Sequence, residues 1–180
     1  MTNKKKLVTE MGRIGADEFR AAGKLPLVVV LDNVRSLHNV GSVFRTSDAF
    51  RVECIMLCGI TATPPAAEIH KTALGAEDVV EWKYFKSTMD AVAELRTAGY
   101  KIYSIEQCCG SIALHHFEAL PGERYAVILG NEVKGVQQAV VDASDGAIEI
   151  PQFGTKHSLN VSVTAGMVIW EFAKKQGLVE

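Results

Sequence analysis

The stretch AVILGNEVKGV, residues 126–136, carries the strongest indication of the fold. Four apolar residues run into Gly130, and Asn131 and Glu132 follow at once. A short apolar run that ends at a glycine is typical of a strand buried on both faces, as in a parallel sheet. Polar residues directly after such a strand lie at the carboxyl edge, where open α/β sheets bind ligands. The stretch therefore predicts an α/β fold with a ligand site near Glu132.

The rest of the chain alternates between strand-like and helix-like segments. The strand-like runs are rich in β-branched residues and end at Gly, Pro or a polar residue; they span residues 26–31, 54–59, 101–106, 125–130 and 146–151, with a weaker sixth in 78–85. Helical spacing is found in residues 9–22, 39–51, 64–74, 87–99, 136–144 and 160–175. Ser87 is expected to cap one of these helices, and Gly99 to follow its end. The alternation predicts a mostly parallel sheet with helices on both faces.

Length and composition indicate one compact domain. The chain has 180 residues, of which 48% are hydrophobic and 22% charged. We expect a basic arm and helix over residues 1–25 and the domain over residues 26–180. No apolar run approaches the roughly 20 residues of a membrane span, and no apolar segment follows the charged N-terminus. The sequence therefore predicts a cytoplasmic protein with no membrane partner.

The charge balance gives little support to nucleic-acid binding. The formal net charge is −2, which argues against a domain coated in positive charge. The segment Lys4, Lys5 and Lys6 forms a local basic arm, which is either a contact surface or a solvated tail.

The four cysteines do not have the pattern of a disulfide framework or a metal site. They form two pairs in the sequence, Cys54 with Cys58 and Cys108 with Cys109. We expect reduced, mostly buried thiols. His115 and His116 lie far from either pair and match no zinc-ligand spacing, so no metal is expected.

The common nucleotide and hydrolase motifs are missing from this α/β pattern. No G-x-G-x-x-G follows a strand. Gly130 and Gly135 have the spacing of a phosphate-binding loop, but Val136 replaces the required lysine. Ser47 lacks the glycine frame of a nucleophile elbow.

Three polar segments remain, and the first lies in residues 32–50. Asn39 can cap the following helix, and Gly41 allows a ligand or another segment to approach closely. Arg45 lies one to two turns further on, flanked by core-like residues. Its guanidinium either pairs with a carboxylate such as Asp48, faces an anion, or is an ordinary surface group.

The second and third segments hold Glu132 and residues 158–160. Glu132 either belongs to the ligand site or joins the first turn of the next helix, where the dipole stabilises a carboxylate. If residues 158–160 are extended, Ser158 and Asn160 point one way and Leu159 the other. A simpler interpretation makes Asn160 an N-cap.

Together these segments resemble the three motifs of one enzyme family. NVGSVFRTSDAF, ILGNEVKGV and IPQFGTKHSLNVSVTAG, in that order, are similar to the motifs of the SpoU or TrmH family of the SPOUT superfamily of RNA methyltransferases. HKTALGAE, residues 70–77, also resembles the family's connecting segment. The resemblance extends over residues 27–172. It implies an α/β fold with a C-terminal trefoil knot, S-adenosylmethionine as cofactor, a homodimer, and methyl transfer to a ribose 2′-hydroxyl in tRNA or rRNA, with no DNA partner.

The resemblance also implies roles for individual residues. Three line the cofactor site: Gly130, Ile150 and Leu159. Five form the catalytic site: Arg45, Asn39, Glu132, Ser158 and Asn160. Within this set, the resemblance implies that Glu132 helps to order the site together with Asn39 and Asn160. An arginine does not readily give up its proton in a protein, so Arg45 is expected to bind an RNA phosphate and stabilise the developing alkoxide rather than act as the base. Two alternatives stay open, a non-catalytic RNA-binding protein of the same fold and a SPOUT enzyme that methylates a base.

Overall fold

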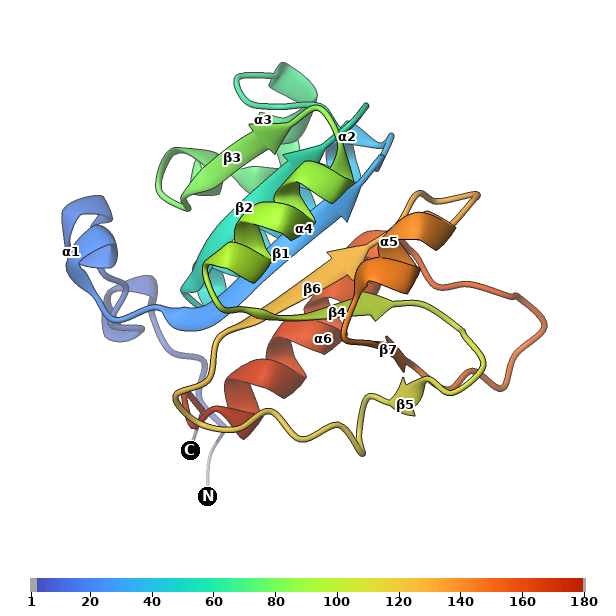
Figure 1. Cartoon of the computed structure of the whole chain (residues 1–180). Helices are drawn as coiled ribbons and strands as arrows, with labels where there is room; N and C mark the ends of the chain where they lie inside the picture. The colour runs from blue at the N-terminus through green and yellow to red at the C-terminus, as the bar shows by residue number, and fades with distance from the viewer. Residues whose placement is uncertain (1–2, 180) are drawn as a thin grey trace.

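A computed structural model describes residues 3–179, and its centre is a seven-stranded sheet (Figure 1). The strands are β1 Leu25–Asp32, β2 Val52–Cys58, β3 Trp82–Phe85, β4 Lys101–Ile105, β5 Ile112–Ala113, β6 Tyr125–Leu129 and β7 Gly146–Glu149. They lie in the order β3-β2-β1-β6-β4-β7-β5, and every pairing is parallel. The predicted parallel α/β fold is confirmed, and all six predicted strands are present. The two-residue strand β5 was not predicted, because its apolar run, residues 112–114, is only three residues long.

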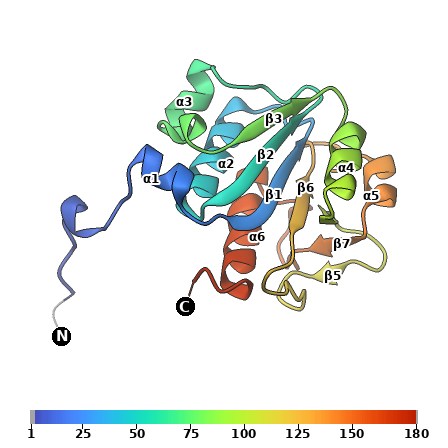
Figure 2. The ribbon, with the colours of Figure 1, turned by 60° about the vertical axis from the view of Figure 1, so that its left-hand side comes forward.

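Helices cover both faces of the sheet (Figures 1 and 2). They are α1 Ala16–Ala21, α2 Leu37–Ala49, α3 Ala67–Ala73, α4 Thr88–Thr97, α5 Gln138–Ala143 and α6 Val161–Lys175, with short 3-10 turns at Val8–Glu10 and Ala76–Asp78. Helices α2, α3 and α6 bury their apolar side chains in one core cluster, which includes Phe44 and Phe172. Helix α4 and α5 pack on the opposite face around Leu95 and Val140.

The helix ends show which local signals acted as expected. The Ser87 hydroxyl accepts a hydrogen bond from the Met89 N–H at 3.2 Å, and Gly99 has a φ of +80° just past α4. The prediction that Asn39 caps α2 is wrong. Ser36 is the cap, and its Oγ accepts from the Asn39 N–H at 3.3 Å. Asn39 therefore lies inside the first turn of α2, with its side chain free to reach other loops.

The predicted helix over residues 9–22 is also wrong in length. A 3-10 turn at Val8–Glu10 and the short helix α1 replace it. Gly12 lies between them with a φ of +61°, a left-handed conformation that breaks a right-handed helix. Lys4 to Lys6 are exposed and have no regular secondary structure.

The thiols are free but less buried than predicted. Cys58 is buried and Cys109 is exposed, while Cys54 and Cys108 are intermediate. In the part of the chain that the structure describes, no helix is both long enough and apolar enough to cross a bilayer.

The strand order creates a switch point at the carboxyl edge of the sheet. Strand β6 lies between β1 and β4, and Leu129 pairs with Leu31 on one side and Ile105 on the other. After β1 the chain adds β2 and β3 on one side of it, and the four later strands, β4 to β7, all lie on the other side. Ligands of open α/β sheets bind at such a point. The trefoil threading of the C-terminal part stays a prediction.

Candidate functional site

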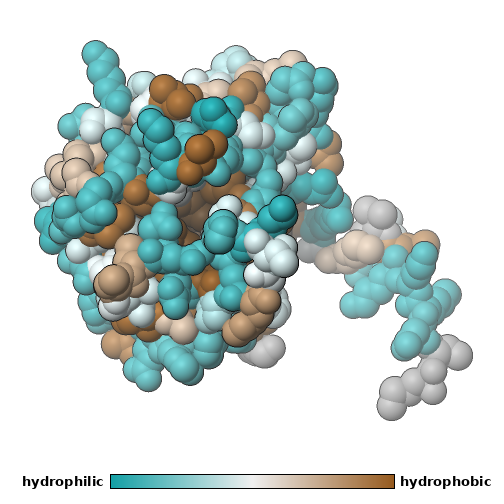
Figure 3. Space-filling view, turned by 90° about the vertical axis from the view of Figure 1, so that its right-hand side faces the viewer, coloured by the Kyte–Doolittle hydropathy of each residue, from teal (hydrophilic) through white to brown (hydrophobic). Residues whose placement is uncertain are grey.

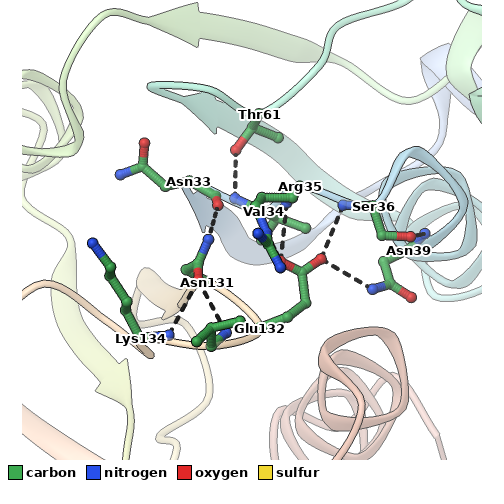
Figure 4. A network of polar contacts seen from close by, with 10 residues as sticks. Asn33, Val34, Arg35, Ser36, Asn39, Thr61, Asn131, Glu132 and Lys134 are labelled. Carbon is green, nitrogen blue, oxygen red and sulfur yellow. Dashed lines mark hydrogen bonds and ion pairs between the residues drawn. The ribbon is translucent and has the colours of Figure 1, made fainter.

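The segment after β6 forms a tight turn that begins at Gly130. Asn131 and Gly135 exchange two backbone hydrogen bonds of 3.0 and 2.9 Å. A Cβ added to Gly130 would lie 2.1 Å from the backbone nitrogen of Val136, so only glycine fits there. The Asn131 side chain fixes the turn by donating to the Asn33 carbonyl at 2.8 Å (Figure 4). The turn directs Glu132 toward α2.

The Glu132 carboxylate binds the N-terminal end of α2. Its Oε2 accepts from the Arg35 N–H at 3.0 Å, and its Oε1 accepts from the Ser36 N–H at 2.9 Å (Figure 4). Oε1 also accepts from Nδ2 of Asn39 at 3.2 Å. Burial acts to raise the pKa of Glu132, but these donors outweigh it and hold the pKa below its ordinary value. The simpler interpretation, in which Glu132 joins the first turn of the next helix, is therefore wrong: the carboxylate binds α2, and α5 begins only at Gln138.

Asn39 extends this contact to the third polar segment. Its Oδ1 accepts from Nδ2 of Asn160 at 3.2 Å. The Asn160 Oδ1 in turn caps α6, accepting from the Ser162 N–H at 2.9 Å. Three segments far apart in the sequence are thus joined by one chain of hydrogen bonds, from Glu132 through Asn39 to Asn160.

A pocket of about 470 Å³ opens beside this chain of contacts. Figure 3 looks onto this edge of the molecule and shows a hollow with hydrophobic atoms at its floor and hydrophilic atoms at its rim. Its lining includes Gly130, Ile150 and Leu159, the three residues expected at the cofactor site. Within residues 3–179, the backbone N–H and C=O groups of these three residues form no hydrogen bond. Free backbone groups beside apolar side chains suit a planar heterocycle such as adenine.

Residues 158–160 do not alternate as an extended segment would. Ser158 and Leu159 both line the pocket, whereas Asn160 turns away to cap α6. The cap fixes the Asn160 side chain at the start of the helix. The Ser158 hydroxyl is exposed and has no hydrogen-bond partner among the residues described.

Sequence reasoning missed Glu106, which follows β4 at the same edge. Its Oε2 accepts from the Val136 N–H at 3.0 Å, and its Oε1 accepts from the Gln107 N–H at 2.9 Å. The side-chain amide Nε2 of Gln107 donates to the His157 carbonyl at 2.9 Å. The end of β4 therefore holds both loops that line the pocket. Its position directly after a strand is the signal that could have identified it.

Asp32 was missed as well, although it ends β1. The side chain is fully buried, with a relative exposure of 0%. It accepts from the Gln137 N–H at 2.9 Å, from Nε2 of Gln137 at 2.7 Å and from the Thr88 hydroxyl at 2.6 Å. A buried carboxylate with this many donors is fully satisfied, and it fixes the end of the turn to β1.

The structure does not bring Arg45 into this pocket. Arg45 is exposed on α2 and lines a second cavity of about 690 Å³, together with Arg13 and Arg51. No ion pair joins Arg45 to Asp48 in the described part of the chain. Asp48 has a raised pKa because burial outweighs the opposing charges of Arg13 and Lys24. Asp48 lines the same cavity, but the three arginines outnumber it, and this excess of positive charge suits an anion.

Gly41 serves a packing contact rather than a ligand. A Cβ added there would lie 2.2 Å from the Ile69 carbonyl oxygen and 2.2 Å from the Thr72 hydroxyl oxygen. Helix α3 thus takes up the space that the glycine leaves on α2.

Comparison with known proteins places these features in context. Residues 26–170 match the model of the SpoU rRNA Methylase family. A 23S rRNA (guanosine-2′-O-)-methyltransferase of Neisseria meningitidis is 32% identical over 153 residues, which cover 85% of this chain and 60% of that protein.

Two solved structures share the architecture. The AdoMet-bound rRNA methyltransferase of Sinorhizobium meliloti superimposes with a TM-score of 0.79 at 25% identity, covering 90% of this chain and 61% of that one. The TrmH/SpoU tRNA modifying enzyme of A. aeolicus gives a TM-score of 0.79 at 23% identity, covering 91% and 83%.

Proposed function

The chain belongs to the SpoU rRNA methylase family, and from this premise we propose that it is an S-adenosylmethionine-dependent methyltransferase acting on a ribose 2′-hydroxyl in tRNA or rRNA. The observation that carries the proposal is the chain of hydrogen bonds from Glu132 through Asn39 to Asn160, beside a pocket with free backbone groups. The names of the Neisseria and Sinorhizobium relatives support the reaction and the cofactor. The chain spans only 60% of the length of the Neisseria protein.

The pocket suits the proposed cofactor. Its volume of about 470 Å³ lies within the range of small-molecule sites. Ile150 and Leu159 offer apolar side chains for the adenine, and free backbone groups at Gly130 offer its hydrogen bonds. Ser158 lies at the same pocket, with a hydroxyl available to the cofactor or to the ribose.

The purified protein is expected to bind S-adenosylmethionine without RNA, as measured by isothermal titration calorimetry. Gly130→Ala should abolish the binding, because its new Cβ meets backbone at 2.1 Å and the turn must open. Gly23→Ala is the matched control, since a Cβ there meets nothing within 4 Å. Folded wild-type protein that releases no heat with the cofactor would contradict the cofactor assignment.

The proposed role of Arg45 must fit its position in the second cavity, outside the cofactor pocket. A ribose hydroxyl is a poor nucleophile until its proton leaves, so the site must align the methyl group and stabilise a developing alkoxide. Arg45 lies in a cavity with Arg13 and Arg51, which suits an RNA phosphate. Bound RNA would then bring its backbone to this cavity and its target ribose to the cofactor, with phosphate or water accepting the proton.

The type of substrate is tested in cells. Mapping ribose 2′-O-methylation and base methylation in tRNA and rRNA, with and without this protein, should reveal one missing 2′-O-methyl group. A missing base methyl group would favour the base-methylating alternative, and no missing methyl group would favour the non-catalytic RNA-binding protein. The proposed site of action is the cytoplasm.

We also propose a homodimer packed through α6 and α2, the helix of the first motif. Helix α6 exposes a row of large apolar side chains. Val163, Met167 and Trp170 are 49%, 44% and 45% exposed at helical spacing, and Trp170 stacks edge-on against Phe50 at 5.7 Å. The sequence of α6 also predicts a close approach of the partner at two small residues, Ala165 and Gly166. Ala165 does not serve this surface, because it is fully buried toward the core, whereas a Cβ added to Gly166 would meet nothing within 4 Å.

Light scattering at micromolar concentration should find a dimer. Met167→Lys is expected to shift it toward monomer, because a charge in an apolar interface is costly. Met89→Lys, the same change at a 40% exposed position on α4 across the sheet from α6, should leave the dimer intact. A monomeric wild-type protein would contradict the proposal.

A further inference from the structure

Two loop tips stand at the rim of the cofactor pocket, and each exposes an apolar side chain. Phe153, between β7 and α6, is 97% exposed, more than any other large hydrophobic residue described. Val133, in the turn after β6, is 74% exposed. The pocket is lined by Val133 on one side and by the neighbours of Phe153, Gln152 and His157, on the other. The phenyl ring thus stands beside the entrance without packing on the protein.

Each tip also carries a lysine that forms no ion pair within the described residues. Lys134 follows Val133 and points away from the Glu132 contacts (Figure 4). Lys156 lies three residues after Phe153. Within residues 3–179, neither lysine forms an ion pair, and residues 133–141 and 150–160 contain no Asp or Glu. The side-chain charges of the two tips are therefore positive, whereas the carboxylates of the site, Glu106, Glu132 and Glu149, line the pocket itself.

A flexible anion with flat apolar groups fits this rim. Proteins that hold single-stranded nucleic acid combine aromatic side chains, on which bases stack, with cations that follow the backbone. A protein partner would be expected to meet a larger continuous apolar patch than one ring and one valine. These side chains also stand at the entrance of the pocket, where an RNA strand must pass if its ribose is to reach the cofactor.

We propose that Phe153 stacks on a base of the substrate RNA next to the nucleotide being methylated, while Lys134 and Lys156 bind its flanking phosphates. The inference rests on the proposed function and adds a contact for RNA capture. It assigns to the outer part of loop 150–160 a role separate from the cofactor contacts of Ile150 and Leu159. Because any base has a stacking face, Phe153 provides affinity and orientation rather than base identity.

The test measures RNA binding and methyl transfer with unmodified tRNA and rRNA transcripts. Phe153→Ala should weaken RNA binding roughly tenfold or more, the range of base–aromatic stacking, and raise KM for RNA with little change in S-adenosylmethionine affinity. Phe153→Trp should retain binding, and its added indole fluorescence should be quenched by RNA. Lys134→Ala with Lys156→Ala should reduce the salt dependence of binding. Leu120→Ala, another exposed apolar residue, is the matched control.

Four outcomes would overturn the inference. Unchanged RNA affinity in Phe153→Ala would remove the stacking contact, and lost cofactor affinity would place the ring in the cofactor site. A change from dimer to monomer would make Phe153 a contact between copies of the chain. Wild-type protein that binds cofactor but no RNA would contradict the proposed function itself. If the wild-type protein methylates RNA and Phe153→Ala methylates it equally well, only this inference is contradicted.

Discussion

Replacing Arg45 by alanine is expected to lower the rate of methyl transfer at least a hundredfold while leaving the affinity for S-adenosylmethionine unchanged. Arg45 does not line the cofactor pocket, so its loss should not disturb the bound cofactor. If its guanidinium holds an RNA phosphate and so aligns the ribose with the methyl group, the loss falls mainly on the transition state, at roughly 3 kcal/mol or more. Single-turnover transfer of a labelled methyl group gives the rate, and calorimetry gives the affinity.

Asn160→Ala provides the contrast, because Asn160 joins the loop that carries Leu159 to α6. Its loss should affect both methyl transfer and cofactor affinity, with about 1 kcal/mol of stability lost from the helix cap. Arg45→Ala protein that methylates RNA at the wild-type rate would show that the catalytic assignment is wrong. A folded Arg45→Ala dimer without cofactor binding would instead place Arg45 in the cofactor site. Full activity of Arg45→Lys, with a pH-independent rate, would also contradict the proposed role.

Most of the fold could be predicted because its signals are local. The buried strands β1 and β6 are apolar runs with clear ends, and α4 and α6 carry their own caps, Ser87 and Asn160. The order of strands could not be predicted in this way. The position of β6 beside β1 depends on pairs such as Leu27 with Tyr125, which are 98 positions apart (125 − 27), and no local pattern records such contacts.

For the site as well, local sequence signals predicted the residues but not the contacts between distant segments. The position of Glu132 at a strand end indicated a ligand site, but its partners are the backbone N–H groups of Arg35 and Ser36, which carry no side-chain signal. Asn39 was expected to cap α2, because its residue type favours caps. Ser36 takes that place, and this frees the Asn39 amide to join Glu132 to Asn160. Local propensity thus identified the residue and missed its contact.

Glu132→Gln is expected to destabilise the folded protein by roughly 2 kcal/mol and to weaken cofactor binding. The carboxylate accepts three hydrogen bonds, from the N–H groups of Arg35 and Ser36 and the amide of Asn39. Glutamine has one acceptor oxygen, so its NH₂ group would face a donor. Charged hydrogen bonds contribute about 1.5–3 kcal/mol, and a donor left unsatisfied adds a further penalty. Because this side chain is only 22% exposed, water compensates little of the loss.

The pH dependence of unfolding separates this effect from a general loss of packing. The hydrogen bonds lower the pKa of Glu132 in the folded protein below its value in the unfolded chain. Its contribution is therefore fully present above the ordinary carboxyl pKa and is lost as the pH falls through the lowered folded value. Urea unfolding between pH 3 and pH 7 should show a shallower acid loss in Glu132→Gln than in wild-type protein. Glu118→Gln, at an exposed position, is the control and should retain the wild-type slope. An unchanged slope in Glu132→Gln would mean that the ionised carboxylate does not hold the N-terminus of α2 to the turn.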